Sequence, residues 1–81
     1  MIREVLSVKV GAWSCSVLEH EEGWDFAVCW RGEDRAVVIP SVVFETCDRR
    51  LFERRGLPKY VARKLASVCR THRVLRAVRP A

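Results

Sequence analysis

Residues 57–72 read LPKYVARKLASVCRTH, and this stretch decides the fold that we predict for the chain. Along it, the side chains that would face a core recur at intervals of four, four, three and four residues. They are Leu57, Val61, Leu65, Val68 and His72. This spacing is typical of an amphipathic helix with one buried stripe. We therefore predict a helix over residues 58–72.

The start of this helix and its other side are also marked in the sequence. Gly56 precedes the helix, and Pro58 stands in the first turn, where proline is best tolerated. Lys59, Arg63 and Arg70 fall on the side opposite the apolar stripe. The helix therefore has one face for a core and one cationic face that is available to a ligand.

Four segments before this helix show the alternation of period two that is typical of β-strands. They cover about residues 2–10, 13–19, 24–31 and 35–39. Gly11 and Ala12 separate the first two segments, either as a tight hairpin turn or as a bulge within one long strand. The N-terminal half of the chain is therefore predicted to form a sheet.

The third of these segments has the clearest alternation. Trp24, Phe26, Val28 and Trp30 face one side, and in the simplest register Trp13 lies on the same face of the sheet. We expect these large side chains to be mostly buried, because a small domain needs them in its core.

The fourth segment and the residues after it are less regular. Residues 36–39 are apolar on both faces, which predicts a central position in the sheet, and Pro40 ends the strand. Residues 41–55 are predicted to form a second helix, because apolar side chains recur there four residues apart. The alternative is that the strand continues through residues 42–44, which are good β-formers.

Together these segments predict an α+β fold in a single small domain, residues 1–81. An antiparallel sheet of three to four strands is followed by one or two helices that pack on one of its faces. Residues 73–79 fit either an extension of the last helix or a short closing strand, and this choice stays open. With 81 residues, 49% of them hydrophobic and 31% charged, the chain has the composition of a globular protein with one small core.

The cysteines are predicted to be free thiols within the core. There are four of them, each in an apolar pattern: Cys15, Cys29, Cys47 and Cys69. No pair has the C-x-x-C spacing, and His20 and His72 complete no zinc-site pattern with them. We therefore predict neither a metal site nor a cofactor.

The expected compartment is the cytoplasm. The first ten residues, MIREVLSVKV, carry charges and lack the apolar core of a signal peptide. A membrane-spanning helix needs about 20 consecutive apolar residues, and no apolar run in the chain approaches this length. No membrane contact is therefore expected.

Catalytic residues are scarce. Cys69 and His72 stand three residues apart on one predicted helix, the spacing of a thiolate–imidazole pair. No third residue is evident to orient the imidazole, so a packed cysteine and a histidine at the border of the core explain the pair better. We therefore expect a binding protein and not an enzyme.

Charge is distributed unevenly along the chain. Residues 1–40 hold four Lys and Arg against seven Asp and Glu, whereas residues 41–81 hold eleven against three, and the net charge of the chain is +5. Such a cationic half commonly binds phosphates or the carboxylates of a partner. The predicted binding residues are Arg49, Arg50, Arg54, Arg55, Lys59, Arg63, Lys64, Arg70 and Arg73.

Two classes of ligand fit these residues. The first is nucleic acid, contacted mainly at its phosphates, because the chain contains no Asn or Gln for base reading. The second is an acidic protein surface, as for a small inhibitor or adaptor encoded by a virus or mobile element that blocks a host complex. A homodimer is compatible with both, through a sheet edge or an apolar helix stripe.

Overall fold

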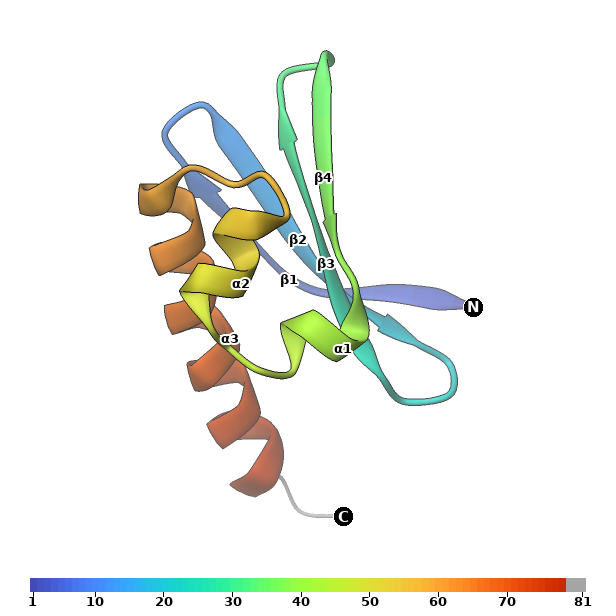
Figure 1. The fold of residues 1–81 in the computed structure, drawn as a ribbon. Helices are drawn as coiled ribbons and strands as arrows, with labels where there is room; N and C mark the ends of the chain where they lie inside the picture. Colours follow the sequence, from blue (N-terminus) through green and yellow to red (C-terminus); the bar gives the residue numbers. More distant parts are fainter. Residues whose placement is uncertain (79–81) are drawn as a thin grey trace.

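The computed structural model describes residues 1–78 and shows four strands followed by three helices (Figure 1). The strands are β1 (Ile2–Val10), β2 (Trp13–His20), β3 (Asp25–Arg31) and β4 (Arg35–Ile39). The helices are α1 (Ser41–Phe44), α2 (Arg49–Arg54) and α3 (Lys59–Val78). The predicted α+β arrangement, with helices after the sheet and packed on one face of it, is confirmed.

The sheet is an antiparallel meander with the strand order β1-β2-β3-β4. Gly11 and Ala12 form a tight turn between β1 and β2, so the alternative of one bulged strand does not apply there. Gly11 has a φ of +59°, a conformation that glycine adopts without strain. A separate irregularity in the β1–β2 register lies between Glu4 and Leu6.

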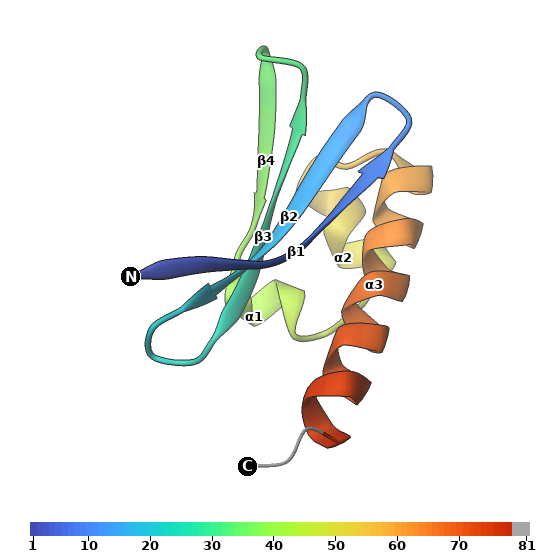
Figure 2. The same cartoon turned by 180° about the vertical axis from the view of Figure 1, so that it is seen from behind.

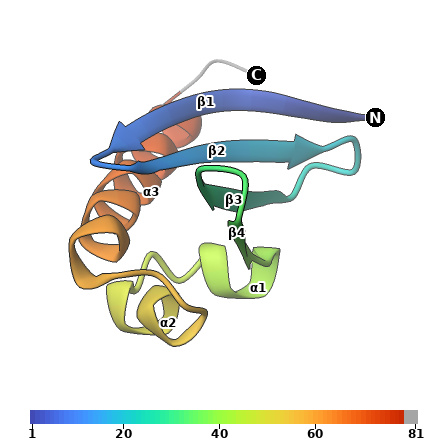
Figure 3. The ribbon, with the colours of Figure 1, turned by 90° about the horizontal axis from the view of Figure 1, so that it is seen from above.

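The core lies between the sheet and the helices. All three helices are on the same side of the sheet, and the other side is left uncovered (Figures 2 and 3). Apolar side chains of β2, β3 and β4 meet apolar side chains of the helices in one cluster. Its fully buried members include Trp13, Val17, Ile39, Phe52, Val61 and Leu65.

The prediction that the aromatic side of β3 is buried was wrong. Phe26, Val28 and Trp30 do share one face, but it is the uncovered face, and Trp30 is 40% exposed. Ala27 and Cys29, on the other face, are fully buried. Helix α1 packs on β3, so the covered face of β3 takes small residues and its large residues point outward.

Two further expectations about the aromatic and apolar residues were also wrong. Trp13 is buried on the covered face, so it does not share a face with Trp30, and Trp24 precedes β3 and is 42% exposed. Strand β4 is at the edge of the sheet and not at its centre. Its apolar run reflects Val37 and Ile39 in the core and Val38 on the uncovered face.

The predicted helix over residues 41–55 is two helices. Cys47 has a φ of +51°, which no α-helix accommodates, and it separates α1 from α2. The side chain of Asp48 accepts a hydrogen bond from the backbone N–H of Arg50 at 2.9 Å and so caps α2. A new helix therefore begins where the sequence pattern suggested continuity.

Helix α3 is longer than predicted, and its buried face differs slightly from the predicted apolar stripe. It extends to Val78, so residues 73–78 are helical, and residue 79 lies outside the described residues. Val61 and Leu65 are buried as expected, and Ala62 and Ala66 beside them are buried as well. Ala66 lies beside the α1–α2 turn, and His72 lies half-buried at the border of the stripe.

The prediction of four free thiols is contradicted. Cys15 pairs with Cys29, and Cys47 pairs with Cys69, as disulfides. Cys15 and Cys29 are direct neighbours in the β2–β3 register, and Cys47 lies beside α3 because of the break between α1 and α2. Pairing thus depends on strand register and on the α1–α2 turn, neither of which can be read from cysteine spacing.

In the part of the chain that the structure describes, no helix combines the length and the apolar character that crossing a membrane requires.

Candidate nucleic-acid interface

Helices α2 and α3 are placed side by side by the turn that joins them. Gly56, with a φ of +118°, follows the end of α2, and its N–H donates to the carbonyl of Glu53 at 2.9 Å. The N–H of Leu57 reaches the carbonyl of Phe52 at 3.5 Å, which completes a Schellman motif. The chain then reverses and α3 begins at Lys59, next to α2.

A hollow between these two helices is ringed by basic side chains. Its lining comprises Arg49 and Arg50 from α2, Lys59 and Arg63 from α3, and one carboxylate, Glu53. The four cationic residues are all exposed. Four positive charges against one negative charge make this hollow attractive to an anion.

A second hollow adjoins the first, because Arg49 and Arg63 line both. Arg70 and Arg73 extend it along α3, and Asp48 supplies its one carboxylate. We call the six basic residues that line these two hollows the basic α2–α3 surface. It consists of Arg49, Arg50, Lys59, Arg63, Arg70 and Arg73.

The charges of this surface are not neutralised by ion pairs within the described residues. Arg70 donates to the carbonyl of Cys47 at 3.4 Å, and Arg73 donates to the carbonyl of Glu45 at 2.6 Å. A carbonyl partner orients a guanidinium but leaves its unit charge uncompensated, and other N–H donors stay available. The surface is therefore both partly ordered and cationic.

Three of the predicted binding residues lie elsewhere. Arg55 donates from Nε to the carbonyl of Val38 at 3.4 Å, at the edge of β4, and Arg54 is exposed at the end of α2 without lining either hollow. Lys64 is about 100° around α3 from Arg63, since each helical residue advances by that angle. The structure thus brings together six of the nine predicted residues.

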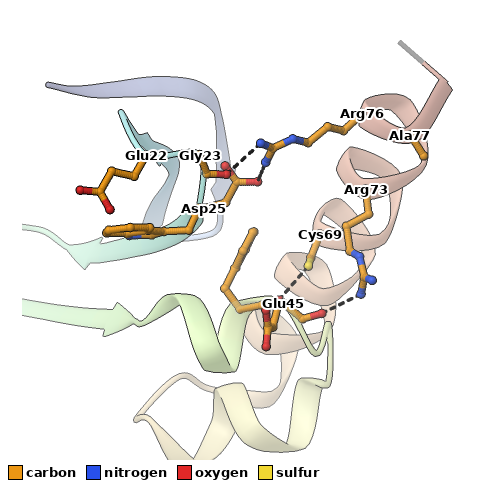
Figure 4. A pocket seen from close by; sticks show the side chains of 10 residues that line it. Glu22, Gly23, Asp25, Glu45, Cys69, Arg73, Arg76 and Ala77 are labelled. Atoms are coloured by element: carbon orange, nitrogen blue, oxygen red, sulfur yellow. Dashed lines mark hydrogen bonds and ion pairs between the residues drawn. The ribbon is translucent and has the colours of Figure 1, made fainter. Parts of the chain in front are cut away.

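A further cavity, of about 620 Å³, shares Arg73 with the second hollow and lies between the β2–β3 turn, α1 and the C-terminal part of α3 (Figure 4). Its two arginines are held by acceptors in the cavity wall. Arg76 donates to Oδ2 of Asp25 at 2.6 Å and to the carbonyl of Gly23 at 2.8 Å, and Arg73 reaches Glu45 from the other side. The Arg76 contacts hold α3 to the start of β3, and the Arg73 contact holds α3 to the end of α1.

His72 completes this tie, and the sequence analysis did not anticipate it. Its Nε2 lies 3.0 Å from Oδ2 of Asp25, and both side chains are largely buried, with exposed fractions of 14% and 12%. Oδ1 of Asp25 is buried with no hydrogen-bond partner in residues 1–78. The signal was the i, i+4 spacing of His72 and Arg76, which puts both on the face of α3 toward the sheet.

The structure offers no thiolate–imidazole pair, because Cys69 is joined to Cys47 and His72 binds Asp25. Among residues 1–78, no three His, Cys, Asp or Glu side chains gather as they would to hold a metal ion.

No protein-family model matches the chain, and neither curated protein sequences nor solved structures include a significantly similar one.

Proposed function

We propose that this protein binds nucleic acid through the basic α2–α3 surface, contacting phosphates with little sequence specificity. The observation that carries the proposal is the pair of adjoining hollows, which share Arg49 and Arg63 and gather six cationic side chains around two carboxylates. Neighbouring cations without ion-pair partners in residues 1–78 are well suited to a ligand that carries a regular row of negative charges.

The chemistry of the surface supports phosphate as the recognised group. Five of its six residues are arginine, whose planar fork binds phosphate oxygens in pairs. From Lys59 to Arg73 the surface extends about 21 Å along α3, which is the length of about six base pairs of duplex. Without Asn or Gln in the chain, the side chains that most often read adenine are missing.

The proposal is tested by a triple substitution, Arg49→Ala, Lys59→Ala and Arg63→Ala. None of these side chains contributes to the core, so the far-ultraviolet circular dichroism should match that of the wild type. Binding to a fluorescently labelled duplex should weaken. Its log affinity should also depend less steeply on log salt, with a slope smaller by about two to three, because each lost phosphate contact removes about 0.9 from the slope.

A matched control removes the same charge elsewhere. Arg31, Arg54 and Lys64 are exposed and lie outside the basic α2–α3 surface. Their combined replacement by Ala lowers the net charge equally, so it reduces long-range attraction to the same extent. The slope should then stay close to that of the wild type. Equal losses in the two triple variants would show that net charge alone drives binding.

The alternative, a small inhibitor or adaptor that binds an acidic protein surface, predicts a different outcome. The wild type would then show negligible affinity for duplex or single-stranded nucleic acid near physiological salt. That result would overturn the nucleic-acid proposal.

A further inference from the structure

The face of the sheet that the helices leave uncovered carries a cluster of apolar side chains on β2, β3 and β4. Trp30 and Val38 on this face are 40% and 49% exposed, and Leu18, Phe26 and Val28 are half-buried around them. The largest exposed apolar patch of a small protein is often the surface that meets a partner.

Cross-strand register arranges this face in rows. The central row is Ser7, Ser16, Val28 and Val38. The row on one side is Glu4, Leu18 and Phe26, and the row on the other side is Lys9, Ser14, Trp30 and Ala36. The acidic and basic residues of β1 therefore lie on opposite sides of the central row, as do the two large aromatic residues of β3.

We propose that this face is a homodimer interface in which two copies pack sheet against sheet about a two-fold axis that lies along the central row. Rotation about this axis brings Lys9 of one copy over Glu4 of the other, and Trp30 over Phe26. Val28 and Val38 meet their own counterparts. Each residue with a charge or a large ring then faces a complementary one, and the sheets lie aligned, as in β-sandwiches.

The edge strand β4 is poorly suited to pair with a second copy, which favours association through the face of the sheet. Arg55 donates to the carbonyl of Val38, so this carbonyl points away from β3 and is already occupied. A second copy that added a strand to β4 would displace this contact, which protects the edge from pairing.

Charge also argues against nucleic acid as the occupant of this face. Its one lysine is balanced by Glu4, and the basic α2–α3 surface is on the helix side of the sheet. Bases stacked on Trp30 would leave their phosphates without cations, whereas single-strand binders combine stacking with a basic groove. The dimer proposal does not depend on the proposed function.

The face is small, so the dimer should be weak. Four strands spaced about 4.8 Å apart and about five residues long cover roughly 320 Å² in plan on each copy, or about 640 Å² in the dimer. This is below the about 1,200 Å² of a standard interface and is typical of weak, transient complexes. Sedimentation velocity of the intact chain should therefore show a reversible monomer–dimer equilibrium between low micromolar and submillimolar concentrations.

The first test replaces a residue on the axis. Val38→Glu sets two carboxylates against each other in the dimer, and it should leave the chain monomeric throughout this range. The control is Val42→Glu, at an exposed residue of α1 on the helix side, which should dimerise like the wild type. Circular dichroism and thermal melting establish that both variants fold.

The second test uses the predicted Lys9–Glu4 pairing. Lys9→Glu and Glu4→Lys should each raise the dimer dissociation constant about three- to ten-fold, because each places like charges together twice. An equimolar mixture of the two single variants should associate as the wild type does, since every contact in the mixed dimer is complementary. The double variant in one chain should also regain the wild-type dissociation constant.

Several results would overturn the proposal. One is a wild-type chain that stays monomeric at every concentration, and another is a dimer that Val38→Glu does not weaken. A third is a monomer whose tryptophan fluorescence is quenched by a single-stranded oligonucleotide, with the quenching lost in Val38→Glu. Failure of the mixed variants to associate would refute the two-fold arrangement.

Discussion

At the scale of single residues, the position of a side chain relative to the helices decides what it contributes. Phe52 and Phe26 have the same side chain, yet Phe52 is fully buried and packs against Phe44 at 6.3 Å between ring centroids. Phe26 is half-buried on the uncovered face of the sheet. Burial, and not residue type, should therefore set the energetic contribution of each ring.

Replacing Phe52 by Ala should lower the free energy of unfolding by about 3–5 kcal/mol, because it leaves a cavity in a small core. Phe26→Ala should cost about 1–2 kcal/mol, since its ring is already partly solvated. Urea denaturation followed by circular dichroism measures both values. A larger loss for Phe26→Ala would mean that the covered face has been assigned to the wrong side of β3.

The cysteines make a second prediction at this scale. Alkylation of the unfolded chain without reductant should add no adducts, and alkylation after reduction should add four, as intact-mass analysis would show. Closing loops of 14 and 22 residues should stabilise the fold by about 3 kcal/mol each in the chain-entropy model. Four adducts without reductant would show that the pairs are close but not bonded.

At the scale of elements, short helices depend on their ends. Helix α2 has six residues, which is too short to be stable alone, and it relies on the Asp48 cap and on the Schellman motif at Gly56. These two ends also set the direction of α3 and so the two hollows. Local hydrogen bonds at α2 therefore determine the shape of the basic α2–α3 surface.

Replacing Gly56 by Ala should lower the free energy of unfolding by about 1–3 kcal/mol, because a φ of +118° is strained for any residue with a Cβ. Space is not the cause, since the new Cβ would lie 3.5 Å from a Val37 methyl and 3.6 Å from Arg35 Nη2, which are ordinary contacts. Thermal melting measures the loss. A variant as stable as the wild type would show that α2 does not need its C-terminal motif.

At the scale of the whole molecule, the two proposed surfaces lie on opposite sides of the sheet. The helices lie on one side of the sheet (Figure 3) and carry the basic α2–α3 surface, whereas Phe26 and Trp30 lie on the uncovered face. A dimer formed through the sheets would place two basic surfaces outward, where both stay accessible. The two functions are therefore separable by substitution.

Val38→Glu should leave the affinity for a short duplex unchanged, because residue 38 is on the side of the sheet away from the basic α2–α3 surface. On a long duplex the same variant should bind more weakly than the wild type, since a monomer cannot engage two segments at once. Fluorescence anisotropy with the two lengths measures both. A loss on the short duplex would indicate that the two surfaces are coupled.

The sequence by itself determined the four strands, the last helix and their order along the chain. Alternation placed the four strands, the apolar spacing of Val61 and Leu65 placed the last helix, and Pro40 ended β4 where expected. Part of the basic α2–α3 surface was also predicted, because Lys59, Arg63 and Arg70 fall within one sector of a helix. These are local properties, because they depend only on the spacing of apolar and charged residues along one segment of the chain.

Tertiary structure alone decided which face of each element is covered. Alternation in β3 is equally consistent with Phe26 or Ala27 facing the core, and only the packing of α1 on β3 selects Ala27. The cysteine pairs and the Asp25–His72 contact likewise join residues far apart in the chain. Such contacts depend on register and on close approach between layers, and the spacing of residues along one segment carries no information about either.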